Sequence, residues 1–432
     1  MSMNWPPVDR FPEEMSDAYI DERIRQSPDV LTGLGELPAI EAGEELRRAF
    51  ESTVVPTAQM RFVLRNMTSK ARAYARYAYG DEPSILRRIY SGIQPAREMR
   101  ITLLASLAGA GKTVTLNAFQ RLHQDTKVEL RDHASLGLKA AWMLTAQNGV
   151  SAKTLLLPHF RHDGEKRKLT LTSTEVSREC ATQGVAILLG DEFQFISRSN
   201  KSALTANTIF QLTKIGPPVF IATNYSLLHS FMRRGQEDKQ RLFSDVIELK
   251  PEPRNSNDWL TIVRSALRVS VEFHPLIEDD AVHYELHDLT FGIDRLLTNL
   301  LHHSYLAMRE RSAPHVTIDG IRKAYASIHY AASRKEILQL EAGILNPSTL
   351  PADLTCPISA TPCHAGNSHS SPAEKAAAEA RQAELEKSLN AKEVAAAKKT
   401  STATRVPRIR PAKPVFSADS LINASHRFSK KK

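Results

Sequence analysis

The chain has 432 residues, 42% of them hydrophobic and 24% charged, which is the composition of a globular protein with two or three domains. No stretch approaches the roughly 18–20 apolar residues of a membrane helix. Three dispersed cysteines and no secretory signal pattern lead us to expect a cytoplasmic protein without a membrane partner. Of the net charge of +9, residues 373–432 carry +8, with fourteen Lys and Arg against six Asp and Glu.

The first hundred residues have helical patterns. Ser16 is an N-cap signal for a helix over 16–25, and residues 42–51 favour a helix. Apolar residues recur at helical spacing within 70–98. We therefore predict an N-terminal helical extension over 1–70, with a further helix leading into the next domain.

Apolar runs alternate with helical patterns over residues 71–250. The predicted strands are 101–105, 184–190, 218–223 and 246–249, and the predicted helices between them include 113–123 and 174–181. Continuous apolar strands that alternate with helices indicate an α/β domain, in which helices flank both faces of a parallel sheet.

Strand signals stop after residue 250. Helices predicted at 258–268, 293–311 and 318–329 indicate a small all-α domain over 251–335. Residues 336–372 become rich in Pro, Ser and Thr, which predicts a linker. We expect residues 373–432 to form a basic tail, helical at first and then disordered.

Residues 106–113, Ser-Leu-Ala-Gly-Ala-Gly-Lys-Thr, follow the first predicted strand and outline a phosphate-binding loop. The pattern requires Gly at its first position, where this chain has Ser106, so we predict nucleotide binding and leave rapid hydrolysis open. The predicted roles are phosphate contact for Ser106, Ala108, Gly109, Ala110 and Gly111, contact with the β- and γ-phosphates of ATP for Lys112, and Mg²⁺ binding for Thr113.

An acidic pair follows the second predicted strand. Asp191 at a strand's carboxyl end can hold Mg²⁺ beside Thr113, and Glu192 can orient and polarise the attacking water. The residue before the pair is Gly190, where a bulky apolar residue is usual. We therefore predict a metal site made by Thr113 and Asp191, with slow hydrolysis as one possible consequence of Gly190.

Other polar residues can complete such a site. Asn224 ends the third predicted strand and can fix the water, although Asn is also an ordinary turn residue. Arg295 begins a predicted long helix and can point back at the γ-phosphate. In the charged helical segment 231–243, Arg234 or Arg241 can reach a neighbouring subunit's nucleotide as an arginine finger; a solvated helix face is the alternative.

Taken in order, these motifs resemble an AAA+ ATPase over residues 70–335, and within that class a transposition regulator of the TnsC/TniB type. The closer resemblance lies in Gly190-Asp-Glu-Phe-Gln-Phe-Ile, Ile221-Ala-Thr-Asn, Phe291-Gly-Ile-Asp-Arg-Leu-Leu-Thr-Asn-Leu-Leu and Val316-Thr-Ile-Asp-Gly-Ile-Arg-Lys-Ala-Tyr. The resemblance implies an AAA+ P-loop fold with a lid domain, and first and second sensor roles for Asn224 and Arg295. It leaves the finger open between Arg234 and Arg241, with Arg234 preferred.

The resemblance also implies partners: duplex DNA, a transposase, target-selection proteins and further copies of the chain in a ring or filament. The chain would oligomerise on target DNA and recruit or activate the transposase. Loops between the two phosphate elements would face the DNA, and their basic residues would neutralise phosphates without reading sequence. The candidates are Lys153, Arg161, Lys166, Arg167 and Lys168, with a charged surface hairpin as the alternative.

Two other functions remain open at this point. The chain can be a replication-initiator or helicase-loader type of AAA+ ATPase, since these share much of the pattern. It can also be an ATP-responsive DNA scaffold that does not hydrolyse, which Ser106 and Gly190 suggest. The basic tail is either a docking segment for the transposase or a nonspecific nucleic-acid arm.

Overall fold

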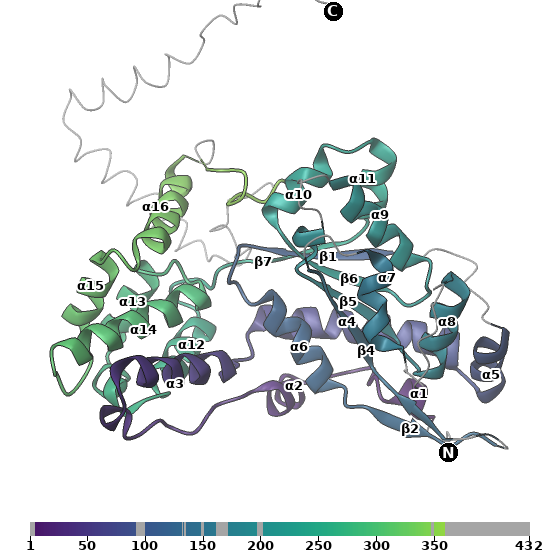
Figure 1. Cartoon of the computed structure of the whole chain (residues 1–432), viewed down its shortest axis with the longest axis horizontal. Coiled ribbons are helices and arrows are strands. Elements are labelled where there is room, and N and C mark those ends of the chain that lie inside the picture. The colour runs from purple at the N-terminus through teal and green to yellow at the C-terminus, as the bar shows by residue number, and fades with distance from the viewer. Residues whose placement is uncertain are drawn as a thin grey trace, which may run out of the picture. The chain divides into compact units, whose positions relative to one another are not determined.

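A five-stranded parallel sheet, in the order β4-β5-β6-β1-β7, organises the α/β part of the chain (Figure 1). The structure is a computed structural model that describes residues 5–91, 100–131, 133, 135–147, 151–160, 172–196, 202–346 and 350–358. The sheet strands are β1 (Ile101–Ser106), β4 (Ala141–Thr145), β5 (Ile187–Asp191), β6 (Val219–Asn224) and β7 (Val246–Leu249). The predicted parallel sheet is confirmed, and four of its strands were expected, β7 with the observed bounds and the other three with slightly different ends.

The edge strand β4 was missed by sequence analysis. Its residues, Ala-Trp-Met-Leu-Thr, include good helix formers and no Val or Ile, so local propensity does not indicate a strand. Parallel pairing with β5, in which Leu144 lies opposite Gly190, holds the segment extended. A separate antiparallel pair consists of β2 (Thr126–Val128) and β3 (Leu136–Leu138).

The two faces of the sheet belong to two different hydrophobic clusters, because side chains alternate along each strand. In β1, Leu104 joins one cluster, whereas Leu103 and Ala105 join the other. The Leu104 cluster includes apolar residues of the helices before and after β1, and the Leu103 cluster includes those of the helices before and after β6. The sheet is therefore covered on both sides, as predicted.

The helices of this part follow the alternation with the strands. They are α1 (Pro6–Asp9), α2 (Asp17–Ile24), α4 (Ala58–Tyr79), α5 (Glu82–Ser91), α6 (Lys112–Leu122), α7 (Ala152–Leu156), η2 (Leu157–His159), α8 (Ser173–Thr182), η3 (Phe193–Ile196), α9 (Ser202–Thr213), α10 (Tyr225–Met232) and α11 (Gln236–Leu242). Ser16 caps α2 by accepting a hydrogen bond from the backbone N–H of Tyr19 at 3.1 Å, which confirms the predicted start of that helix.

Residues 251–345 form a helical region, which continues past the predicted end of the all-α domain at residue 335, because residues predicted to begin the linker belong to the last helix. It contains α12 (Asn257–Leu267), η4 (Val271–Leu276), α13 (Asp280–Asp288), α14 (Asp294–Glu310), α15 (Ile318–Ala326) and α16 (Ala331–Leu345). Two elements from the N-terminal part of the chain also pack in this region, the 3₁₀ turn η1 (Leu34–Glu36) and α3 (Ala39–Ser52). A Cβ at Gly43 of α3 would lie 3.0 Å from Leu306 and 3.1 Å from His302 of α14, so the two helices pack closely (Figure 1).

The N-terminal segment thus contributes to two parts of the structure. Whereas α3 packs on α14, α4 packs against the sheet, and α4 runs through residue 70 without a break. The chain between them, residues 53–57, passes beside the start of α6. This placement brings N-terminal residues to the site described below.

Residues 350–358 return to the α/β part. Leu354 and Cys356 are buried, and the carbonyl of Thr355 lies 2.9 Å from His229 Nε2 on α10. By its internal contacts the chain divides after Gly366, and residues 359–432, with the predicted tail and part of the linker, lie outside the described residues. Among the described helices, none combines the length and apolarity needed to cross a bilayer.

Candidate functional site

The loop between β1 and α6 is shaped to receive an anion. Gly109 and Gly111 have φ angles of +86° and +85°, which residues with side chains rarely adopt. Gly111 directly precedes α6, an 11-residue helix whose first backbone N–H groups lack partners within the helix. Such a helix start attracts negative charge, and phosphate groups most of all.

Lys112 folds back onto the base of this loop. Its Nζ donates to the Ser106 hydroxyl at 2.8 Å, the Leu107 carbonyl at 2.9 Å and the Ser106 carbonyl at 3.3 Å. Burial lowers the pKa of Lys112 to about 8, against the opposing effect of Asp191 and Glu192. The loop therefore holds Lys112 through three hydrogen bonds, and an anion in the loop would compete for its Nζ.

Ser106 fits its position without a positive φ, because it is the last residue of β1. Its buried hydroxyl donates to the Leu107 carbonyl at 2.8 Å and accepts from Lys112. A glycine is thus not required by the backbone here. The serine side chain adds a hydroxyl contact to Lys112 that a glycine would lack.

The acidic pair lies at the end of β5. Asp191 is buried, and its Oδ1 accepts from the backbone N–H of Glu192 at 2.9 Å. Glu192 has φ +57°, an unusual value for a residue with a side chain, and Gln194 Nε2 donates to its carboxylate. Burial, and next the charge of Asp191, raise the pKa of Glu192. A raised pKa makes the Glu192 carboxylate a better proton acceptor than an ordinary glutamate.

Gly190 is explained by the packing around β5. A Cβ at this position would lie 2.5 Å from Ile221 Cδ1 and 2.6 Å from Phe193 Cε2. The ring of Phe193, just past the acidic pair, thus occupies the space that a bulky residue at position 190 would fill. The backbone that carries Asp191 and Glu192 is supported by Phe193.

Asn224 and Arg295 come from two other elements to the same cleft. Asn224 ends β6 directly opposite Ser106 of β1. Arg295, in the first turn of α14, has its backbone N–H 3.4 Å from the Gly109 carbonyl and its Nη2 3.4 Å from the Ala108 carbonyl. A Cβ at Gly109 would lie 2.7–2.8 Å from the Arg295 side chain, so the first turn of α14 packs directly against the loop.

One cleft is lined by residues from all of these segments. Those predicted from sequence that line it are Ala108, Gly109, Gly111, Lys112, Thr113, Asp191, Glu192, Asn224 and Arg295. Ala110 lines the adjoining cavity, and Ser106 lies beneath the loop. The hydroxyl of Thr113 and the carboxylate of Asp191 are hard oxygen donors of the kind that Mg²⁺ prefers, so these two residues fit the predicted metal.

The arginine-finger candidates do not line this cleft. Arg234 Nε donates to Asp238 at 2.8 Å, and the Arg241 guanidinium lies 4.1 Å from the centre of the Phe210 ring. The predicted charged helix is in fact two short helices, α10 and α11, with Arg234 between them. Whether either arginine serves another subunit stays a prediction.

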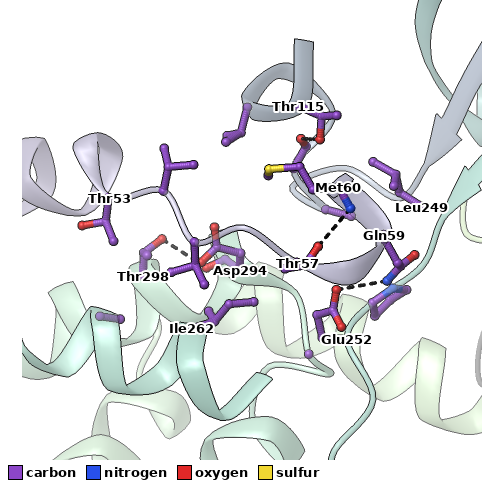
Figure 2. Close-up of a pocket in the computed structure, with 18 of the residues that line it drawn as sticks. Thr53, Thr57, Gln59, Met60, Thr115, Leu249, Glu252, Ile262, Asp294 and Thr298 are labelled. Atoms are coloured by element: carbon purple, nitrogen blue, oxygen red, sulfur yellow. Dashed lines mark hydrogen bonds between the residues drawn. The ribbon is translucent and has the colours of Figure 1, made fainter. Parts of the chain in front are cut away.

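A second cavity adjoins the cleft and was missed by sequence analysis (Figure 2). It lies between the 53–60 segment, α6, the chain after β7 and the start of α14. The two cavities share Phe50, Thr53, Gly111, Val114, Asp294 and Thr298. Much of its wall is apolar, including Val54, Met60, Val114, Leu249, Ile262 and Ala266, which suits a flat aromatic ring.

The missed residues carry no motif. Thr53 to Met60 lie about 50 residues before the phosphate-binding loop, and only tertiary packing brings them to it. Asp294 lines both cavities and is exposed to solvent. The combined site can hold an aromatic ring at one end and a phosphate chain with a cation at the other.

Of the predicted DNA contacts, Lys153 is exposed on α7. Arg161, Lys166, Arg167 and Lys168 lie outside the described residues. The proposed DNA surface therefore stays a prediction.

No protein-family model and no curated protein sequence matches this chain. Solved structures that resemble it include Cdc6p of Pyrobaculum aerophilum (TM-score 0.38, 15% identity, covering 70% of this chain and 79% of that one). The ORC2 protein of Aeropyrum pernix, with ADPNP and ADP, has a TM-score of 0.41 and 14% identity, covering 70% and 79%. RuvB of Thermotoga maritima, a Holliday junction branch migration motor, has a TM-score of 0.33 and 14% identity, covering 67% and 82%.

Proposed function

We propose that this protein binds ATP with Mg²⁺ and hydrolyses it, as an ATPase of the AAA+ class. One observation supports the proposal above all others: a single cleft is lined by the glycine loop, an acidic pair, a strand-end amide and a lid arginine. These groups come from β1, β5, β6 and α14, so their meeting is a property of the tertiary structure. The adjoining apolar cavity provides a place for the base.

Each group has a distinct part in this function. The loop N–H groups and Lys112 bind the phosphates, and Thr113 and Asp191 hold Mg²⁺, which would neutralise phosphate charge. Glu192 orients water and accepts its proton, and Asn224 fixes the water from the neighbouring strand. Arg295 stabilises the charge that develops on the γ-phosphate and couples the helical region to the nucleotide.

The test is equilibrium binding of ATP together with phosphate release, with and without duplex DNA. Lys112→Ala should lose binding. Glu192→Gln should keep ATP affinity within about threefold and lower turnover at least 100-fold. Glu51→Gln, which removes an exposed carboxylate at the edge of the same cleft, is the matched control and should change neither. Normal turnover of Glu192→Gln would contradict the proposed mechanism.

We further propose that ATP-bound copies assemble on duplex DNA and regulate DNA transposition by recruiting or activating a transposase. Support comes from the resemblance of residues 190–196, 221–224 and 291–301 to transposition regulators. The position of Arg234 and Arg241 away from their own chain's cleft is compatible with a finger that acts between subunits.

Two measurements test this part. Strand transfer by a purified transposase should rise with this protein and ATP; loading of a replicative helicase instead would favour the initiator alternative. Mixing Lys112→Ala with Arg234→Ala tests the finger, because a mixed interface would pair an intact nucleotide site with an intact arginine. Recovery of turnover in the mixture supports Arg234, and recovery only with Arg241→Ala supports the other candidate.

A further inference from the structure

The side-chain amide of Gln59, at the edge of the second cavity, has one consistent orientation. Its Oε1 accepts from the backbone N–H of Lys250 at 2.9 Å, and its Nε2 donates to the Lys250 carbonyl at 3.0 Å. A reversed amide would face a donor with a donor and an acceptor with an acceptor. The Nε2 also donates to Glu252 Oε1 at 3.0 Å (Figure 2). One carboxylate oxygen of Glu252 is therefore engaged by Gln59, and the Thr57 side chain also hydrogen-bonds to this carboxylate.

The backbone of Glu252 is anchored to the helical region. Its N–H donates to the Gly292 carbonyl at 3.1 Å, and its carbonyl accepts from His287 Nε2 at 2.9 Å. Gly292 has φ +68°, and a Cβ there would lie 2.2 Å from the Glu252 carbonyl oxygen. Because both backbone and carboxylate are held, Glu252 presents a fixed acceptor at the wall of the cavity.

Among the described residues, Glu252 and Asp294 are the carboxylates that line this cavity, and they lie at different ends. Asp294 also lines the phosphate cleft, whereas Glu252 lines only the second cavity. In a nucleotide the edge of the base is the part farthest from the phosphates. Glu252 is therefore the carboxylate that a bound base would meet.

We infer that Glu252, positioned by Gln59, reads the 6-position of a purine base, accepting a hydrogen bond from the 6-amino group of adenine and repelling a 6-oxo group. This inference rests on the proposed nucleotide site and adds its base specificity. An ionised carboxylate only accepts hydrogen bonds, so a carbonyl oxygen in the same place meets a second acceptor. In an apolar cavity such a mismatch stays uncompensated.

The same geometry predicts a change of specificity. In Glu252→Gln, the Gln59 amide still requires an acceptor, so it engages the new carbonyl oxygen and leaves the new amide nitrogen as a donor. A donor at this place favours the 6-oxo group of hypoxanthine over the 6-amino group of adenine. The variant should therefore prefer ITP to ATP.

The experiment compares the affinities of the full chain for ATP, ITP and purine riboside triphosphate, which lacks the 6-amino group. Burial, with a further contribution from Asp258, raises the pKa of Glu252 to about 7, so the titration is run at pH 8.5. The unmodified protein should bind ATP about 10- to 100-fold more tightly than either analogue. The three ligands carry the same triphosphate group, so any change in the phosphate contacts affects their three affinities equally and cancels from the ratios.

Variants then assign the effect. Glu252→Gln should bind ITP at least as tightly as ATP, and Gln59→Ala should lower the ratio of the two affinities while leaving ITP affinity within about threefold. Glu248→Gln, four residues earlier and outside this cavity, should keep the unmodified ratio. Circular dichroism verifies that each variant is folded.

Three results would overturn the inference. Equal affinities of the unmodified protein for the three ligands would remove the base specificity while leaving the nucleotide site intact. An unchanged ATP preference in folded Glu252→Gln would assign the specificity to another group. Failure of all three triphosphates to bind would instead remove the proposed function itself.

Discussion

The Nζ of Lys112 lies 2.8 Å from the hydroxyl oxygen of Ser106, the residue that replaces the first glycine of the phosphate-binding loop. A bound phosphate must therefore replace this hydrogen bond before it can pair with Lys112. Ser106→Ala should therefore raise ATP affinity, by up to about tenfold, because a hydrogen bond to a charged group contributes about 1.5 kcal/mol or more. Binding of a fluorescent ATP analogue measures the change.

Ser106→Gly is the companion variant, because it removes the Cβ as well as the hydroxyl. Equal gains in the two variants would assign the effect to the hydroxyl. A loss of affinity in both would show that Ser106 supports the bound state instead.

The buried position of Lys112 predicts a pH dependence of nucleotide binding. Its pKa is about 8 in the nucleotide-free protein, and phosphate charge should raise this pKa in the complex. Above pH 8 binding must then take up a proton, so affinity should fall by up to tenfold per pH unit until the pKa of the complex is reached. Calorimetry in two buffers of different ionisation enthalpy measures this uptake. Lys112→Arg stays charged and should give a flat profile between pH 7.5 and 9.5.

Gly190 should be intolerant of a side chain. In Gly190→Ala the new methyl group would meet Phe193 and Ile221 at 2.5–2.6 Å, which should lower the free energy of unfolding by about 1–3 kcal/mol. Thermal unfolding measures the effect. Adding Phe193→Leu should restore part of the lost stability, because the smaller side chain leaves room for the new methyl group. No recovery in the double variant would show that Phe193 is not the cause.

Arg295 is expected to act on hydrolysis more than on binding. Lys112 and Arg295 are the two cationic residues that line the phosphate cleft in the described part of the chain. Arg295→Ala should lower turnover about 100- to 1000-fold while ATP affinity changes less than tenfold, because the guanidinium stabilises charge that develops during the reaction. Single-turnover phosphate release separates the two quantities. A loss of ATP affinity with unchanged single-turnover rate would make Arg295 a binding residue only.

The discrimination between ATP and ITP should weaken at acid pH. Burial raises the pKa of Glu252 to about 7, so below that pH the carboxyl group is protonated and can donate to a 6-oxo group. The ionisable groups around it are Asp258 on α12, His287 on α13 and Asp294 at the start of α14. Affinity ratios at pH 6 and 8.5 test this. The ratio for Glu252→Gln should not change between them.

Much of the α/β part followed from local sequence. Apolar runs that alternate with amphipathic helices require a parallel sheet, and the strand ends at Asp191 and Asn224 then have to meet beside the phosphate-binding loop. Helix α14, which begins at Asp294, could also be predicted, because its apolar residues recur at helical spacing. The edge strand β4 was not, because its residues have helical propensity and only pairing with β5 holds them extended.

By itself, the sequence was enough to predict the proposed phosphate end of the site, since a phosphate-binding loop is continuous in the chain and its chemistry lies in adjacent residues. Only the tertiary structure decided the other end. Gln59, Glu252 and Gly292 are separated by up to about 230 residues, and their contacts carry no local pattern. Long-range packing of α3, α4 and the start of α14 brings them together, because burying apolar surface specifies neighbours that no short stretch of sequence can encode.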